Sequence, residues 1–526
     1  MSIASKIHPL RHLPTAALLL SLLCACSFYE YEDNTEADPV TPTEKYINLS
    51  IVVSSGNEGT TRAPLGGENG DGREAGLERE NKVTGITLML YHDDAGINTN
   101  ENTTIDFIKY FSVTEDANDR ADAGTSYGDK KRDEARYSTG DQLIGSDIDF
   151  SEKYHAIVVA NWDLSEKFTV KASKVKEIRE HLTGVIYSGS GIGIDAANFV
   201  MSLEKDAPID FSNITPEANG NKLVYKIDNA IHIERLAARV DFWMKGAKYA
   251  EYKKIGSDNS DDKRFGYEYD VTKPNGTPSL DKFLLTAVTP FNLYKDEEYL
   301  IKHLNPSKDG IVVYLEDETQ ESYVIDPKTN DKRTVSSVAE PDYYINPLSG
   351  LVKADESNIS TIAGEWRQTT QSLHDSGNSL FKNFDDNIID ANNFRGDNFI
   401  LCYPKENALM LASPLYYYAT GVAIEGYYYK DGKGEGKYHV YYGFLRHQGE
   451  ETNDNIYEIY KAEDFGNENE NTFVGNKKPM NFGVVRNNIY RISIDKITEK
   501  DNEPPKITWQ IKVKNWDMFK HDTIYM

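Results

Sequence analysis

The stretch KYINLSIVVSSGNEGTTRA, residues 45–63, joins an alternating apolar strand to a polar loop that carries an arginine. Apolar side chains recur at every second position, which is the period of a strand that buries one face. The side chains on this face are Ile47, Leu49, Ile51 and Val53. The following residues, 56–82, contain few apolar side chains, so we expect an exposed loop that a protease can reach. Cleavage there would release the strand and open an apolar groove for another chain.

Three arginines lie in this expected loop, at Arg62, Arg73 and Arg79. A trypsin-like protease requires only an accessible arginine, so each of them is a candidate cleavage site. Arg62 lies nearest to the strand, and cleavage after it would leave Ala63 as the new N-terminus.

Residues 1–25 are expected to be a lipoprotein signal peptide. A basic start precedes a short apolar run from about residue 16 to 23, which is too short to remain as a membrane span. The sequence LCAC then looks like a lipobox. Because Ala25 is the small residue that signal peptidase requires before the lipidated cysteine, Cys26 is the expected lipid attachment site. An ordinary secretory signal with incidental cysteines is the alternative. The acidic, proline-containing segment that follows predicts an extended tether.

Composition limits the fold and the partners. The 526 residues include 58 Lys and Arg against 84 Asp and Glu, a net charge of −26, which repels nucleic acid and anionic lipid surfaces. The 34 Tyr and 20 Phe lie in many short alternating runs and favour strands. The length suffices for two domains. Of three cysteines only Cys402 lies outside the signal region, so disulfides cannot hold the fold.

Several patterns in the body of the chain predict individual elements. Residues 154–160 are apolar at both parities, as in a central strand covered on both faces. Residues 171–182 have apolar side chains at helical spacing and form the clearest helix candidate. Tyrosine-rich alternating strands flank the turn 430–436 and predict a hairpin. Its tyrosines are either cross-strand pairs on a half-buried sheet, which we favour, or a platform on which glycans stack.

A second amphipathic strand follows a Pro-Pro break near the end of the chain. Its alternating apolar side chains are Ile507, Trp509, Ile511 and Val513. Such a strand either pairs in its own sheet or reaches the sheet of a neighbour. It presents about four apolar residues at period two, which is the pattern that the groove of the first strand would require.

Motifs for catalysis or metal binding are absent from the sequence, which has no HExxH, CxxC pair, G-x-S-x-G or EF-hand spacing. Cys402 lies in an expected strand and is interpreted as a buried thiol rather than a nucleophile. The acidic run 383–398 offers oxygen ligands for calcium, but such loops are common in a chain of this charge. We therefore expect no enzyme, no cofactor and no metal site.

Together these segments resemble the short-fimbria major subunits of type V pili from Bacteroidales, in the fimbrillin superfamily. The matching segments run in family order: the lipobox at Cys26, TTRA (60–63), VTGITLMLY (83–91), YHAIVVANW (154–162), IERLAARVDF (233–242), LTAVTPFNLY (285–294), YVIDPKT (323–329), LCYPKEN (401–407), TGVAIEGYYY (420–429) and GVVRNNIYRISIDKI (483–497), with the tryptophan-containing strand that follows. The least similar stretches are residues 93–145 and 295–398.

The resemblance implies a mainly β chain with two transthyretin-like β-sandwich domains in tandem, at residues 63–232 and 233–526, behind the lipoprotein signal peptide. It implies export to the outer membrane, cleavage after Arg62 by an arginine-specific protease, and loss of the tether and strand in residues 26–62. The terminal strand of another subunit, about residues 506–526, then fills the groove by donor-strand exchange. A head-to-tail contact that does not close on itself builds a filament, here a cell-surface fimbrium for adhesion and biofilm formation.

The implied partners are copies of the chain itself, accessory fimbrial subunits and the protease. The precursor contacts the membrane only through its lipid anchor, and nucleic acid is not a partner. The arginine-bearing loop and the terminal strand together indicate a shaft subunit rather than a tip or anchor subunit. Truncation of residues 506–526 is then expected to leave a folded subunit that cannot polymerise. The alternative is a monomeric surface lipoprotein that binds glycan or host protein, which the lipobox and the tyrosine-rich hairpin suggest.

Overall fold

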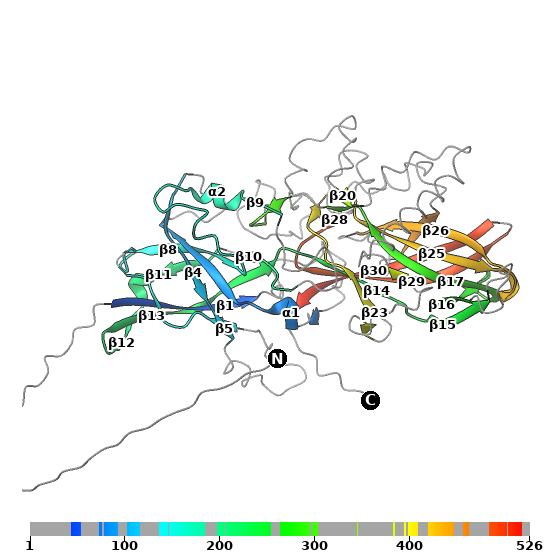
Figure 1. Ribbon diagram of the computed structural model, residues 1–526, viewed down its shortest axis with the longest axis horizontal. Coiled ribbons are helices and arrows are strands. Elements are labelled where there is room, and N and C mark those ends of the chain that lie inside the picture. The colour runs from blue at the N-terminus through cyan, green and yellow to red at the C-terminus, as the bar shows by residue number, and fades with distance from the viewer. Residues whose placement is uncertain are drawn as a thin grey trace, which may run out of the picture.

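The structure is a computed structural model in which two β domains lie end to end (Figure 1). It describes the following residues: 44–53, 73–75, 78–92, 102–115, 136–145, 147–184, 197–204, 206–253, 263–294, 297–302, 344–345, 382–383, 394–395, 398–408, 419–446, 456–461, 483–501 and 503–517.

The described part of the first domain is built on an 11-stranded sheet. Its order is β4 (Ile105–Ser112), β3 (Gly85–Tyr91), β8 (Lys153–Ala160), β10 (Met201–Leu203), β13 (Lys222–Arg235), β1 (Glu44–Val53), β6 (Arg136–Ser138) and β5 (Thr114–Glu115), with β11 (Pro208–Asp210), β12 (Glu217–Asn219) and β7 (Gln142–Leu143) paired beside this path. The predicted central strand is confirmed, because β8 lies between β3 and β10 and its last five side chains are fully buried.

Short helices accompany this sheet. The predicted helix is confirmed in part, as the shorter α2 (Val175–Arg179), which buries Val175 and Ile178. Leu182, expected on the same apolar face, instead lies in a strand and is exposed. It is preceded in the chain by α1 (Glu78–Asn81) and followed by the 3₁₀ turn η1 (Phe211–Asn213). Among the described residues, no helix is both long and apolar enough to cross a bilayer.

The described part of the second domain is built on a 13-stranded sheet. Its order is β15 (Lys248–Lys253), β16 (Lys263–Thr272), β17 (Pro278–Phe291), β25 (Gly421–Tyr429), β26 (Lys437–Phe444), β27 (Ile456–Lys461), β30 (Glu503–Asp517), β29 (Asn488–Lys500), β14 (Arg239–Trp243), β23 (Asn398–Cys402) and β22 (Phe394–Arg395), with β2 (Arg73–Ala75) on β30 and β21 (Lys382–Asn383) on β17. The 3₁₀ turn η7 (Lys430–Gly432) follows β25, so the predicted hairpin is confirmed as β25 and β26.

Two-stranded ribbons complete the described structure. They are β18 (Leu293–Tyr294) with β20 (Tyr344–Ile345), β9 (Leu182–Thr183) with β19 (Glu298–Tyr299), and β24 (Asn407–Ala408) with β28 (Gly483–Val484). The pairing of β9 with β19 joins a segment of the first domain to a segment of the second. The expected mainly β fold with two tandem β domains, consistent with β-sandwiches, is thereby confirmed.

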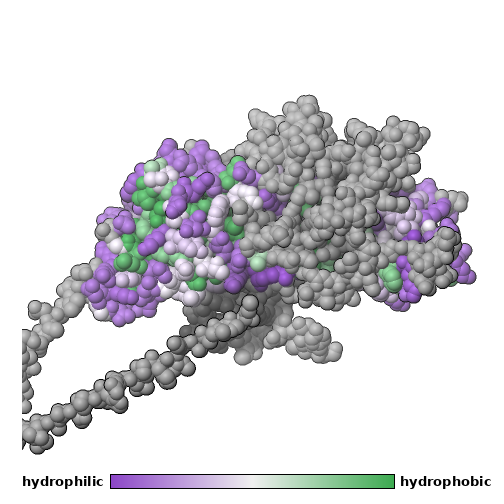
Figure 2. Space-filling model, viewed as in Figure 1, coloured by the Kyte–Doolittle hydropathy of each residue, from purple (hydrophilic) through white to green (hydrophobic). Residues whose placement is uncertain are grey.

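Each domain encloses its own apolar core. The core of the first domain includes the inward side chains of β1, β3, β8 and β13, and the core of the second includes those of β14, β17, β29 and β30. The visible described surface of the first domain is mostly hydrophilic with small apolar patches (Figure 2). The inward side chains of the strands are thus mainly apolar, and the solvent-facing side chains are mainly polar.

The chain crosses from one sheet to the other over residues 236–238, between β13 and β14. All of these residues are fully buried. The N–H of Leu236 donates to Val200 of the first domain at 3.0 Å, and the N–H of Ala238 donates to Pro404 of the second at 2.9 Å. The crossing therefore lies a few residues after the boundary expected at 232/233, because β13 continues to Arg235.

One expectation about the loop 56–82 is wrong. Its last part is not an exposed loop, because residues 73–75 form β2 and residues 78–81 form α1. Glu80 is fully buried and Asn81 nearly so. The polar composition of this segment reflects buried polar contacts as well as solvent exposure, which composition alone does not distinguish.

Candidate assembly site around the first strand

The strand β1 is an interior strand of the first sheet, with a partner along each edge. It pairs in parallel with β13 from Glu44 to Val53, and in antiparallel fashion with β7 near its start and β6 near its end. Removal of β1 would therefore separate β13 from β6 and β7 and leave two strand edges unpaired.

The alternation expected from the sequence is present in β1. The inward side chains Ile47, Leu49, Ile51 and Val53 are 0–1% exposed and belong to the core of the first domain. Val52 is also buried, at 1% exposed, so the end of the strand is covered on both faces. The space that β1 fills is consequently an apolar groove along most of its length.

Hydrogen bonds hold β1 along its length. The N–H of Leu49 donates to Thr139 Oγ1 at 3.0 Å, and the N–H of Thr139 donates to the carbonyl of Leu49 at 3.2 Å. Near the start of the strand, the N–H of Ile144 donates to the carbonyl of Lys45 at 3.1 Å. A strand that replaced β1 would have to supply these backbone groups, because buried groups without partners are costly.

The register of β1 against β13 contains an irregularity. Leu49 lies opposite Ile227, whereas Ile51 lies opposite Ile231. Residues 228–230 of β13 therefore face only Ser50 of β1, which is the pattern of an enlarged bulge. A replacement strand would have to fit this bulge as well as the apolar positions.

The predicted cleavage and lipid sites fall in different parts of the chain. Cys26, Arg62 and Ala63 lie outside the described residues. Arg73 belongs to β2, whose backbone pairs in parallel with residues 515–517 at the end of β30. Arg79 belongs to α1. These two arginines are thus built into regular secondary structure next to the second sheet.

A buried ionic network fixes α1 at the junction of the domains. The carboxylate of Glu80 accepts hydrogen bonds from Arg239 Nη1, at 3.3 Å, and from the hydroxyl of Tyr403. Arg239 also donates two hydrogen bonds of 2.7 Å to Asp241. Burial alone would lower the pKa of Arg239, but the carboxylates of Asp241 and Glu80 outweigh it and raise the pKa. The guanidinium therefore stays charged inside the protein.

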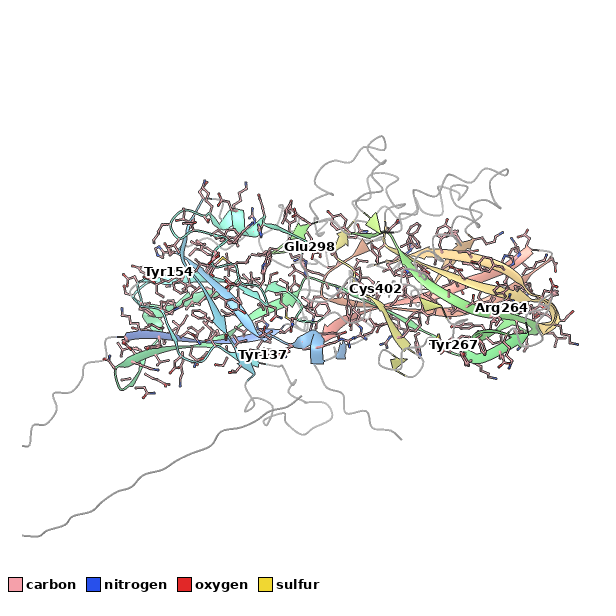
Figure 3. All side chains as sticks on the ribbon, in the orientation of Figure 1. Tyr137, Tyr154, Arg264, Tyr267, Glu298 and Cys402 are labelled. Atoms are coloured by element: carbon pink, nitrogen blue, oxygen red, sulfur yellow. The ribbon has the colours of Figure 1, made fainter. Side chains whose placement is uncertain are left out.

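The next residue of α1 extends this network to the first domain. Arg235 of β13 donates to the side chain of Asn81, and it also donates to Asn487 of the second domain at 2.8 Å. Tyr137 of β6, labelled in Figure 3, donates its hydroxyl hydrogen to the carbonyl of Asn81 at 2.8 Å. Sequence reasoning missed these residues, because their partners lie far apart in the chain and no local pattern marks them.

The predicted donor strand lies inside its own domain. β30 is hydrogen-bonded to β27 on one side and to β29 on the other. Ile507, Trp509 and Ile511 are 0–1% exposed, and Val513 is half-buried. Gly443 leaves the space for the indole, since a Cβ atom there would lie 2.0 Å from Trp509. Truncation of residues 506–526 would therefore remove a core strand, contrary to the expectation that it leaves a folded subunit.

The tyrosine rings of the predicted hairpin pack against side chains of the same sheet. Tyr427 and Tyr438 lie opposite each other with ring centroids 5.3 Å apart, and the guanidinium carbon of Arg264 lies 3.3 Å from the centroid of Tyr427. Tyr252 and Tyr429 stack at 4.2 Å. Arg264 marks this region at the far end of the second domain (Figure 3). These contacts favour cross-strand pairing over a glycan platform.

The other candidates for chemistry in the sequence are a metal site and the thiol of Cys402. They contain no group of three or more His, Cys, Asp or Glu side chains that could hold a metal ion. Cys402 is fully buried at the end of β23, as expected for a structural thiol, and forms no disulfide within the described residues. Most of the acidic run 383–398 lies outside them.

Comparisons with known proteins give structural matches only. No protein-family model and no curated protein matches the chain. It is similar to the structure of a candidate cell adhesion protein from Parabacteroides distasonis, with 12% identity, a TM-score of 0.39, and coverage of 90% of this chain and 100% of that one. A C-terminally truncated tip fimbrial protein from Porphyromonas gingivalis matches with 8% identity, a TM-score of 0.37, and coverage of 90% and 99%.

A fimbrilin from Porphyromonas gingivalis matches with 14% identity and a TM-score of 0.34, over 91% of this chain and 99% of that one. These three solved structures are fimbrial and candidate cell adhesion proteins from Bacteroidales.

Proposed function

We propose that this chain is a shaft subunit of a surface fimbria, exported as a lipoprotein through Cys26 and activated by cleavage after Arg62. In the precursor, β1 occupies the groove that a strand of another subunit fills in the filament. The observation that carries the proposal is the position of β1. It is an interior strand whose inward apolar side chains are buried, and the chain leaves it directly into the segment that contains Arg62.

The burial of β1 determines how strongly an emptied groove would attract a new strand. Each fully buried aliphatic side chain contributes roughly 1.5–3 kcal/mol, so the four inward residues contribute about 6–12 kcal/mol. This is similar to the whole stability of a typical domain, about 5–15 kcal/mol. A subunit that has lost β1 should therefore be unstable alone and should take up a replacement strand.

The identity of the donor follows from the place of β30. If residues 506–517 left their own sheet, the core sites of Ile507, Trp509 and Ile511 would be emptied. We therefore propose that the residues after Asp517, MFKHDTIYM, supply the donor part of the expected range 506–526. Nine extended residues span about 30 Å, close to the length of the ten-residue β1. Departure of the whole of β30 is the alternative route.

Two deletions separate these routes. Deletion of residues 518–526 should leave the thermal unfolding of the subunit unchanged and abolish the ladder of polymers that protease treatment produces. Deletion of residues 506–526 should unfold the second domain, because it removes a strand between β27 and β29. Polymers that persist without residues 518–526 would show that the donor lies elsewhere.

The cleavage site is tested by single substitutions. Arg62→Ala should block both processing and polymerisation, whereas Arg73→Ala and Arg79→Ala serve as matched controls that leave both intact. The controls are chosen because proteases cut exposed extended chain, and Arg73 and Arg79 belong to β2 and α1. Mass spectrometry of filaments should find Ala63 at the N-terminus. Finding only lipid-bearing Cys26, with monomers throughout, would favour a monomeric surface lipoprotein instead.

A further inference from the structure

Glu298 lies at the junction of the two domains, on the ribbon that β19 forms with β9 (Figure 3). Its backbone is paired with Thr183, and the N–H of Leu300 donates to the carbonyl of His181 at 2.8 Å. Leu300 and Ile301 then enter the core of the first domain. A short segment of the second domain is thus inserted against the first, and Glu298 lies at its start.

The carboxyl group of Glu298 is fully buried and incompletely paired. Oε2 accepts the backbone N–H of Glu406 at 3.0 Å and lies 3.9 Å from Arg486 Nη2. Oε1 has no hydrogen-bond partner among the described residues. Arg486 is closer to Glu406, at 3.1 Å, and it also donates to the backbone carbonyls of Tyr299 and Leu300. One guanidinium therefore serves two buried carboxylates, and Glu298 is the more distant one.

We propose that Glu298 is a proton-dependent clamp, so that the contact between the two domains is tighter when this carboxyl group is protonated. An ionised carboxylate with one unpaired oxygen is costly in a buried site, whereas the neutral acid is not. Burial raises the pKa of Glu298 to about 7. Arg486 opposes this effect, and the neighbouring carboxylate of Glu406 adds to it.

The sign of the pH dependence follows from the direction of this shift. The pKa of Glu298 is higher in the folded protein than the ordinary value of 4.5, so the folded protein holds the proton more tightly than the opened one. The stabilisation is fully present at acid pH and is lost as the pH rises through about 7. Between pH 6 and pH 8, opening of the junction should become about tenfold more frequent.

Other charged groups face this cluster from each neighbouring element. Lys405 comes from the segment after β23, and its Nζ lies 3.8 Å from the Cβ position of Gly184 next to β9. Lys302 and Glu234 form a fully buried ion pair of 2.6 Å, and Glu234 also acts on Arg486. Burial lowers the pKa of His181. That imidazole is therefore neutral between pH 7 and 8 and does not replace the charge that Glu298 gains.

The test uses Glu298→Gln in the full chain, with Glu297→Gln as the matched control. Glu297 is the adjacent, exposed glutamate, so its substitution removes a neighbouring carboxyl group while leaving Glu298, Glu406 and Arg486 in place. Hydrogen exchange measured by mass spectrometry, corrected for the intrinsic pH dependence of exchange, should show peptides containing residues 298–302 opening about tenfold more often at pH 8 than at pH 6. The Glu297→Gln variant should behave like the wild type, and the Glu298→Gln variant should lose the dependence.

Equal opening of the wild-type junction at both pH values would overturn the proposal, and this measurement requires no folded variant. Retention of the full pH dependence in Glu298→Gln would also overturn it, because the titrating group would then be another residue. A purely structural role for Glu298 predicts this same outcome, because it would change opening equally at both pH values.

Discussion

Substitution of Leu49 by alanine tests whether β1 is present in each form of the protein. Leu49 is 0% exposed in the core of the first domain, and its backbone is fixed by hydrogen bonds to Thr139. Truncation of a fully buried leucine removes its transfer free energy and leaves a cavity, which together cost about 2–5 kcal/mol. The precursor should therefore lose about this much unfolding free energy in its first domain.

The same substitution should not affect the filament, since β1 has been removed there under the proposed function. Urea unfolding of purified precursor and of filaments, followed by circular dichroism, measures both forms. With a slope of about 2 kcal/mol per molar urea, the midpoint of the first-domain transition should fall by roughly 1–2.5 M in the precursor only. The second-domain transition should stay in place because Leu49 does not contribute to that core.

Ser50→Ala is the matched control in the same strand. Ser50 lies at the bulge opposite residues 228–230 and outside the apolar row, so its loss should change the precursor by less than about 0.5 kcal/mol. Filaments that lose as much stability as the precursor in the Leu49→Ala variant would show that β1 is retained after assembly. An unaffected precursor would show that Leu49 does not lie in the core, and either result would refute the reasoning.

Further predictions concern the second domain and the junction. Gly443→Ala places a methyl group against the indole of Trp509, so thermal unfolding should show a loss of about 1–3 kcal/mol from the second domain. Glu80→Ala leaves Arg239 with one carboxylate partner fewer in a buried site and should cost about 3 kcal/mol in urea unfolding. Asp281→Asn tests acid stability. Burial raises the pKa of Asp281, but hydrogen bonds from the hairpin outweigh it and lower the pKa. The carboxylate thus stabilises the fold above its ordinary pKa, and this advantage is lost as the pH falls through the folded value. The variant should therefore be less stable than the wild type at pH 7 and should approach it at acid pH below the ordinary pKa of 3.8.

Local patterns in the sequence were sufficient to predict several elements. The period of two in β1, the apolar run of β8 and the helical spacing of α2 each reflect which side chains face the core. Because regularly spaced residues of such an element face the core, the apolar pattern repeats along the sequence. It can therefore be recognised without knowing which element packs against it. The hairpin of β25 and β26 was similarly visible because its turn residues separate two alternating runs.

Contacts between distant segments could not be predicted in the same way. The amphipathic pattern of β30 indicated one buried face, but not that the strand lies between β27 and β29 rather than in a neighbouring subunit. Glu80 and Arg239 are 159 residues apart, and the segment around Glu80 has the composition of a solvated loop. A buried ion pair produces no periodic pattern in the sequence. Each partner is a single polar residue, and the residues beside it in the chain are not part of the pair.

The crossing at residues 236–238 has a mechanical consequence. Exposed linkers usually allow neighbouring domains to move separately, but this crossing is fully buried and its backbone is hydrogen-bonded to both domains. No flexible linker therefore separates β13 from β14. Arg235 and Arg239, at the two ends of the crossing, both contact α1. Tensile force applied along the long axis should be transmitted directly from one sheet to the other. The molecule should therefore respond to tension as a single stiff rod rather than as two hinged halves.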